Sequence, residues 1–393
     1  MSKLAINGGA PVHDGLWPRW PQWNNGELAG LQAVLDRGEW GGFDDAVKEF
    51  ERVFAERLQV KHCLTAVNGT LSLVAALHAL GVGPGDEVIV PPYTFIATAN
   101  AVHLVGATPV FADIELETFN LDVAAVEAAI SPRTKAVIPV HFAGLPADMD
   151  ALLPLAEAHD LAVLEDAAHA HGSTWRGRPA GGLGHIGSFS FQASKNLTAG
   201  EGGALTTNDD ALKARLWSYI NQGRTPGGAW YEHGDVGSNL RLTGWQAAIL
   251  LAQMAVFDDQ LTRRMDSARR LHTILAEVDG LEPLRWDERA ESHAFHLFIM
   301  RYLPERFGDL PRERFVAALK AEGIACSTGY PMPLYKQPPL QPPHTRVLDC
   351  PATEQACAQA IWLTQNMLLA EPDEIDRIGE AIFKIRDGID ELR

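Results

Sequence analysis

The feature that most restricts the fold of this chain is a regular alternation of strand-like and helix-like segments between residues 61 and 207. Each strand-like segment is a short apolar run, and stretches with helical spacing of apolar residues separate the runs. This alternation predicts an α/β fold with a mainly parallel central sheet and helices on both of its faces. The expected strands are residues 62–67, 87–90, 109–112, 135–140, 161–165, 187–191 and 203–206.

The pattern changes after Gly244, where residues 245 to about 276 read as one long helix. Beyond it we expect a smaller α+β domain, with helices at 312–322 and 372–389. The 393 residues are enough for two domains. The predicted division is a large domain over 1–250, which includes an N-terminal segment 1–25, and a small C-terminal domain over 251–393.

Lys195 follows the apolar run 187–191 and precedes a glycine-rich turn that ends at Gly203. This setting holds an amine at a strand end, away from the solvated surface where most lysines lie. A partly desolvated lysine loses its proton more readily, and the neutral amine can form a Schiff base with an aldehyde. The alternative is a lysine that only closes the turn.

Asp166 and His169 follow the apolar run 161–165, which is typical of a strand buried on both faces. Ligands of open α/β sheets gather at the carboxyl ends of the strands, where Asp166 is expected. A carboxylate there can pair with a protonated pyridine nitrogen and keep the ring electron-withdrawing. Asp166 can instead be the N-cap of a following helix, and His169 a hydrogen-bonded core histidine.

A third motif, Asn68-Gly69-Thr70, opens a strongly apolar helix. The free backbone N–H groups and the helix dipole would face one point, which suits a phosphate dianion, and the Thr70 hydroxyl is a further donor. An ordinary capped core helix is the alternative.

Three other segments offer weaker candidates. Tyr93 and Phe95 follow a strand that stops at a double proline, and either aromatic ring could stack on a planar ligand. Asn239 and Arg241 lie in a polar turn before the long helix, where anion contacts compete with turn and cap roles. Residues 329–343 form a proline-rich loop in which Tyr330 can shape a substrate pocket, or which is a plain surface connection.

In their order along the chain, these motifs resemble the DegT/DnrJ/EryC1/StrS family of pyridoxal-phosphate sugar aminotransferases, which have fold type I. The resemblance runs from residues 4–9 to the region of Trp362. It is carried by the motifs Asn-Gly-Thr, Pro-x-x-Thr-Phe, Glu-Asp-Ala-Ala-His, Ser-Phe-x-x-x-Lys, Gly-Glu-Gly-Gly and Asn-x-Arg-Leu-Thr.

The resemblance implies pyridoxal 5'-phosphate as the cofactor and a role for each matching residue. Lys195 would be the Schiff-base lysine and proton shuttle, Asp166 would hold the pyridine nitrogen, and His169 would lie by the ring or its phenolic oxygen. Phe95, rather than Tyr93, matches the position that stacks on the ring. Phosphate contacts would come from Gly69, Thr70 and Ser190, and from Asn239 of a partner subunit in a homodimer with shared active sites. The loop 222–237, which contains Trp230 and Tyr231, is expected to reach towards the partner's site.

The same resemblance implies transamination, because related dehydratases have histidine where this chain has Lys195. Residues 6–11 and 140–150 look most like the branch of glutamine-dependent inosose aminotransferases and 3-amino-5-hydroxybenzoate synthases. We therefore expect L-glutamine or L-glutamate as amino donor, a keto-cyclitol or keto-sugar as acceptor, and ping-pong kinetics. The acceptor contacts are expected to include Arg241 and Tyr330. The alternatives are a cofactor-binding regulatory protein without turnover, and a pyridoxal-phosphate lyase, dehydratase or desulfurase.

Charge and cysteine content agree with a cytoplasmic enzyme. The formal net charge of -17 argues against nucleic acid or an anionic membrane as partner. The four cysteines form no CxxC pair and no metal-ligand spacing, and His169 and His171 lack the spacing of a metal site, so no metal is expected. Residues 1–5 lack the apolar run of a signal peptide.

Overall fold

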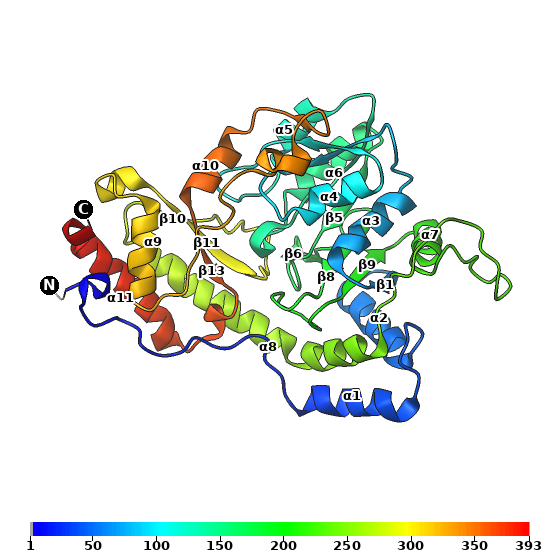
Figure 1. Cartoon of the computed structure of the whole chain (residues 1–393), viewed down its shortest axis with the longest axis horizontal. Helices are drawn as coiled ribbons and strands as arrows, with labels where there is room; N and C mark the ends of the chain where they lie inside the picture. Colours follow the sequence, from blue (N-terminus) through cyan, green and yellow to red (C-terminus); the bar gives the residue numbers. More distant parts are fainter. Residues whose placement is uncertain (1–2, 393) are drawn as a thin grey trace.

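The computed structural model describes residues 3–392 and contains a large α/β part and a smaller part that share one long helix (Figure 1). Residues 1, 2 and 393 lie outside the described residues. The predicted domains contain all three of them, and the predicted lack of a signal peptide concerns residues 1 and 2. Within the described range the main sheet has eight strands. Their order across the sheet is β1 (His62–Ala66), β9 (Gly203–Thr207), β8 (Ile186–Ser190), β5 (Ala162–Asp166), β4 (Thr134–Val137), β2 (Glu87–Val90), β3 (Thr108–Phe111) and β12 (Arg346–Val347).

Seven of these strands run in one direction, and β9 runs against both of its neighbours. The carboxyl ends of β1, β2, β4, β5 and β8 therefore share one edge of the sheet. Because β9 is reversed, its first residue Gly203 also lies at this edge, paired with Ala66 on one side and Ser190 on the other. This edge is where the sequence predicts the site.

Helices cover both faces of the main sheet (Figure 1). One face packs against α3 (Gly69–Ala79), α4 (Ala97–Leu104) and α7 (Asp210–Ile220). The other packs against α2 (Asp45–Arg57), α5 (Val123–Ala129), α6 (Met149–Ala158) and the first half of α8 (Gly244–Leu275), and α1 (Asn25–Arg37) lies along α8. In β2, Val88 and Val90 join the first core and Ile89 joins the second, so the whole strand is buried. That explains why these strands read as continuous apolar runs.

The smaller part has an antiparallel sheet of β10 (Leu281–Pro283), β11 (Leu297–Tyr302) and β13 (Ala360–Thr364). Its core joins this sheet to α9 (Arg312–Ala321), α11 (Pro372–Asp387) and the second half of α8. The helix α10 (Pro351–Gln359) packs near β11, and β6 (Thr174–Trp175) pairs with β7 (Arg178–Pro179) as a short hairpin. Within residues 3–392, none of the helices combines the length and apolar character that a bilayer span requires.

The predicted α/β architecture is confirmed, and most element bounds agree to within two residues. The exception is the strand expected at 135–140, which ends at Val137. Pro139 has no amide to donate to β2, and beyond Ile138 the pairing continues only towards β5, as an isolated bridge between Val140 and Asp166. The boundary at 250/251 stays a prediction: α8 passes through it, and β12 from the C-terminal part pairs with β3. Residues 222–237 contain no helix or regular strand and extend away from the rest of the chain beyond α7 (Figure 1).

Candidate active site

Lys195 lies in the turn that joins β8 to β9, at the carboxyl edge of the sheet. The turn is fixed by its own hydrogen bonds, because Lys195 N donates to Gln192 O at 2.9 Å and Thr198 Oγ1 donates to Phe191 O at 3.0 Å. Burial lowers the pKa of the Lys195 amine to about 8, and the charge of Asp166 opposes this shift. A substantial fraction of the amine is therefore neutral near pH 8 and able to act as a nucleophile.

Asp166 is the last residue of β5, and its side chain is almost completely buried. Thr98 Oγ1 donates to one carboxylate oxygen at 2.9 Å, and Ala168 N donates to the other at 3.3 Å. Burial raises the pKa of Asp166, while these two hydrogen bonds and the nearby Lys195 act in the opposite direction. Residues 167–173 form turns rather than a helix, so Asp166 is not a helix N-cap. The acid is held in place by these two bonds, close enough to Lys195 for their charges to interact.

His169 is buried next to these two groups. Its ring centroid lies 4.2 Å from that of His296 and 5.6 Å from that of Phe142, and its Nδ1 atom has no hydrogen-bond partner. Burial, reinforced by Lys195 and His171, holds the pKa of His169 well below its usual value. The imidazole is therefore neutral at physiological pH, with one ring nitrogen available to a ligand.

Gly69 and Ser190 meet at the start of α3. A Cβ atom on Gly69 would lie 2.6 Å from the Ser190 Cβ atom, so only glycine permits this approach. Asn68 caps the helix through a bond from Leu71 N at 2.9 Å, and the first intrahelical bond comes from Ser72 N. The amides of Gly69 and Thr70 precede that bond and lie beside the Ser190 hydroxyl. This is a cradle for an anion at a helix N-terminus.

Tyr93 and Phe95 have opposite environments although only one residue separates them. Tyr93 is 1% exposed and packs edge-on against Phe119, Phe142 and Tyr330. Phe95 is 58% exposed and lies two residues before the first residue of α4, the helix that carries Thr98. Phe95 is therefore the aromatic ring of the pair that remains available to a ligand.

Tyr330 continues this aromatic cluster from the smaller part of the molecule. Its ring centroid is 5.4 Å from that of Tyr93 and 4.8 Å from that of Trp362. Burial raises the pKa of Tyr330, and the charge of Asp166 raises it further. The proline-rich loop is anchored nearby, because Leu334 N donates to Pro92 O at 2.9 Å.

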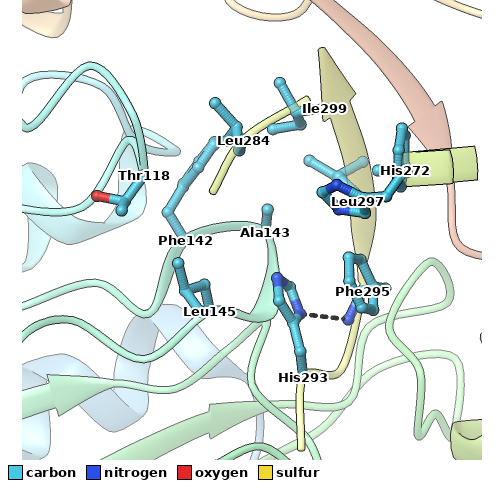
Figure 2. Close-up of a pocket in the computed structure, with 11 residues that line it drawn as sticks. Thr118, Phe142, Ala143, Leu145, His272, Leu284, His293, Phe295, Leu297 and Ile299 are labelled. Carbon is cyan, nitrogen blue, oxygen red and sulfur yellow. Dashed lines mark hydrogen bonds between the residues drawn. The ribbon is translucent and has the colours of Figure 1, made fainter. Parts of the chain in front are cut away.

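A separate small pocket lies behind Phe142 (Figure 2). Phe142, Ala143 and Leu145 form one side of it, and His293 and Phe295 form the other, where Phe295 N donates to His293 Nδ1 at 2.9 Å. Its free volume is about 10 Å³, which is room for one water molecule and not for a substrate. The pocket is a gap in the packing behind the site.

Within residues 3–392, Asn239 and Arg241 form no hydrogen bond with Lys195 or Asp166. Asn239 is exposed and forms a β-bridge with Asn221, and the Arg241 guanidinium lies 5.5 Å from the centre of the Phe43 ring. The segment does run beside the approach to α3, since Val67 N donates to Leu240 O at 2.7 Å. In the adjoining loop, Trp230, Tyr231 and Val236 are each 79% exposed. These residues form an outer surface of the single chain.

Sequence reasoning missed Thr98 and the buried pair beneath the site. His141 Nε2 donates to Glu165 at 2.8 Å, and Ala147 N donates to His141 Nδ1, so the ring carries its proton on Nε2. Glu165 also accepts three backbone N–H bonds, from Gly181, Leu183 and Gly184. Burial alone would raise the pKa of Glu165, but the His141 bond and the backbone donors bring it below its usual value. The sequence signal for Thr98 was its place three residues after Phe95.

Comparison with known proteins gives concordant results. The model of the DegT/DnrJ/EryC1/StrS aminotransferase family matches residues 21–383. The L-glutamine:scyllo-inosose aminotransferase of Streptomyces griseus is 38% identical over 421 residues, covering 100% of this chain and 99% of the relative. The L-glutamine:2-deoxy-scyllo-inosose aminotransferase of Streptoalloteichus tenebrarius is 40% identical over 370 residues, covering 90% of this chain and 85% of the relative. The crystal structure of 3-amino-5-hydroxybenzoic acid synthase matches with a TM-score of 0.88 at 36% identity, covering 96% of this chain and 99% of the synthase chain.

Proposed function

Because this chain belongs to the DegT/DnrJ/EryC1/StrS aminotransferase family, we propose that it uses pyridoxal 5'-phosphate to move an amino group from L-glutamine to a keto-cyclitol. The family and the type I fold that the sequence motifs predict are confirmed, and the chain is an aminotransferase. The cofactor, the donor and the acceptor are the proposal. Its main support is one arrangement at the carboxyl edge of the sheet. An amine of lowered pKa and a buried carboxylate lie near the start of α3, where position 69 leaves no room for a side chain.

The chemistry of this donor set fits pyridoxal phosphate. The amides of Gly69 and Thr70 and the Ser190 hydroxyl match a phosphate dianion, and a side chain at position 69 would fill that space. Asp166 is an acceptor for a ring N–H, and the exposed Phe95 offers a flat apolar surface. His169 Nδ1, buried without a partner, matches a polar substituent of the ring. Each part of the cofactor has a residue of the right kind.

When bound, the cofactor supplies an aldehyde and an electron-withdrawing ring. Lys195 contributes a neutral amine, which would take the proton from the α-carbon of the donor and return a proton to the carbon at the other end of the 1,3-shift. Asp166, oriented by Thr98, holds a proton on the ring nitrogen. His169 stays neutral and adds no positive charge that would compete with this proton. The two half-reactions share one site, so we expect ping-pong kinetics.

The proposed substrates follow the names of the relatives. Two relatives that cover most of this chain are L-glutamine aminotransferases for scyllo-inosose and 2-deoxy-scyllo-inosose. In this chain, Tyr330 is the proposed acceptor contact, supported by its packing against Phe142, whose ring also contacts that of His169. Arg241 is proposed as a substrate contact in the assembled dimer.

We also propose a homodimer in which Asn239 completes the phosphate site of the partner subunit. The exposure of Asn239 and of the Trp230, Tyr231 and Val236 side chains supports this arrangement, because isolated chains rarely leave so many apolar groups in water. A cytoplasmic location remains a prediction from the sequence.

A desulfurase needs a reactive thiolate, which this chain does not offer. Burial raises the pKa of Cys326 to about 11 and the pKa of Cys350 and Cys357 to about 12. Burial also raises the pKa of Cys63 well above its usual value. Thiols of this kind remain protonated near neutral pH.

The test is a donor screen followed by an acceptor panel. Purified protein with bound cofactor is mixed with L-glutamine or L-glutamate, and conversion to the aminated cofactor is followed by absorbance. Keto-inositols and nucleotide-linked keto-sugars are then added to the aminated form, and amine products are identified by mass spectrometry. Lys195→Ala should lose the visible band of lysine-linked cofactor and all turnover. Bound cofactor with no half-reaction for any donor would support a regulatory protein instead and overturn the proposal.

A further inference from the structure

Trp20 belongs to the N-terminal strap, residues 13–23, which runs from the smaller part of the molecule to α1 (Figure 1). The strap is anchored along its length. Trp17 Nε1 donates to Gly323 O at 2.9 Å, and Pro18 O and Gln22 O accept side-chain amides from Asn366 and Gln253 at 2.7 and 2.8 Å. Between these anchors, Trp20 Nε1 donates to the backbone carbonyl of Lys195 at 3.1 Å. One residue of the strap thus bonds directly to the residue proposed as the Schiff-base lysine.

A buried arginine backs the Trp20 ring. The Arg264 guanidinium carbon lies 5.1 Å from the ring centre, and Arg264 is fully buried in α8. Its Nε and Nη2 atoms donate to Gln365 Oε1 at 2.9 and 2.6 Å, whereas Nη1 has no hydrogen-bond partner. Since a buried cation is costly unless compensated, the π face of Trp20 stabilises it. The indole is therefore held in one orientation, with its N–H directed at Lys195.

The opposite side of the lysine turn is fixed by Asn196. Its Nδ2 atom donates to Ala294 O at 2.7 Å, and its Oδ1 atom accepts from His296 Nδ1 at 3.1 Å. The His296 ring packs at a tilt against the His169 ring, so this second contact links the lysine turn to His169. The Lys195–Asn196 peptide is thus held between the N-terminal strap and the segment before β11. Without Trp20, the Lys195 carbonyl would lose its bond to the strap, and the hydrogen bonds within the turn and those of Asn196 would remain.

We propose that Trp20 is a positioning residue for Lys195: its indole N–H fixes the lysine carbonyl, and its ring shields the lysine turn from water. The proposal rests on the role of Lys195 in the proposed function. It assigns to the strap a part in catalysis, since a displaced lysine carbonyl carries the amine away from the donor α-carbon and from Asp166.

The chain offers a matched control in Trp17, which makes the same type of bond to a backbone carbonyl from the same strap. We compare Trp20→Phe with Trp17→Phe in cofactor-free protein. Trinitrobenzenesulfonate reacts with neutral amines, and peptide mass spectrometry gives the pH profile of Lys195 labelling. The groups that face Lys195 are Asp166 on β5, His169 and His171 after it, and His296 before β11, and both variants leave all of them in place.

In the unchanged protein and in Trp17→Phe, labelling of Lys195 should be half-maximal near pH 8. In Trp20→Phe, water reaches the lysine turn, and the midpoint should rise by about 1 pH unit towards the ordinary lysine value. In the enzyme with bound cofactor, the same variant should lower the single-turnover rate of the donor step by roughly tenfold. The donor concentration that gives half of the maximal rate should stay unchanged. Thermal unfolding of both variants controls for folding.

Incorporating benzothienylalanine at position 20 removes only the N–H, and it should reproduce the slower donor step in a fully packed protein. An unchanged labelling midpoint in Trp20→Phe, or an equal shift in Trp17→Phe, would overturn the proposal. The labelling needs neither cofactor nor substrate. If the donor screen finds no amino transfer, the proposed function is refuted. The labelling experiment would still show whether Trp20 positions Lys195.

Discussion

Removal of the Thr98 hydroxyl should move the pH dependence of amino transfer through the pKa of Asp166. Thr98 Oγ1 is one of two donors to this buried carboxylate, at 2.9 Å, and the other is Ala168 N at 3.3 Å. A hydrogen bond to a charged group contributes about 1.5–3 kcal/mol. Because about 1.4 kcal/mol corresponds to one pKa unit, Thr98→Val should raise the pKa of Asp166 by roughly 1 to 2.

The sign follows from the form of the acid that the reaction needs. Ionised Asp166 holds the proton on the ring nitrogen, and a higher pKa leaves less of it ionised at a given acidic pH. The acidic limb of the rate profile should therefore move to higher pH by the same amount, and the rate above that limb should change less. Single-turnover reaction with the donor between about pH 5 and 9 measures the shift.

Two variants separate this effect from packing. Thr98→Ser keeps the hydroxyl and should restore the original profile. Thr94 is equally buried, and its Oγ1 atom lies 3.2 Å from that of Thr98, so Thr94→Val removes a neighbouring hydroxyl but leaves the bond to Asp166. Its acidic limb should move much less. If Thr98→Val binds cofactor and its acidic limb coincides with that of the unchanged protein, the hydrogen bond does not set this pKa.

Three further outcomes are expected. Gly69→Ala places a Cβ atom 2.6 Å from the Ser190 Cβ atom, and equilibrium dialysis should show cofactor affinity reduced by roughly tenfold, or about 1.4 kcal/mol; unchanged affinity would exclude a tight phosphate cradle. Asn239→Ala should weaken cofactor retention in the dimer during gel filtration, and full retention would remove the partner's role. Glu165→Ala leaves His141 and three backbone donors without their buried acceptor, which should cost about 3–5 kcal/mol in urea unfolding. Because the folded pKa of Glu165 is depressed, its stabilisation is present above the ordinary glutamate pKa and is lost as pH falls through the lower folded value, so the difference between the two proteins should shrink in acid.

The regular part of the fold could be predicted because burial on both faces leaves a strong local signal. The strand expected at 87–90 is β2 (Glu87–Val90), and the long helix expected at 245–276 is α8 (Gly244–Leu275). The two-residue strand β12 carries no such signal. Arg346 and Val347 form a strand only because β3 presents a free edge to them.

The candidate site was predictable where a motif is local, and not where its partners are distant in sequence. Lys195 and Asp166 both follow apolar runs, so their place at the sheet edge can be inferred. The choice between Tyr93 and Phe95 depends on tertiary packing, which buries one ring and exposes the other. The Trp20 contact joins residues 175 positions apart, and no local pattern could indicate it.

The uninterrupted course of α8 has a consequence for motion. Its 32 residues span about 48 Å, contain neither proline nor a glycine after Gly244, and contribute Leu250 to one core and Leu271 to another. No flexible linker is available there, so the two parts cannot rotate about residue 250 without breaking helical hydrogen bonds. A movement that opens the site without disrupting α8 would therefore have to come from elsewhere in the chain, for example from loop 222–237, which contains no helix or regular strand.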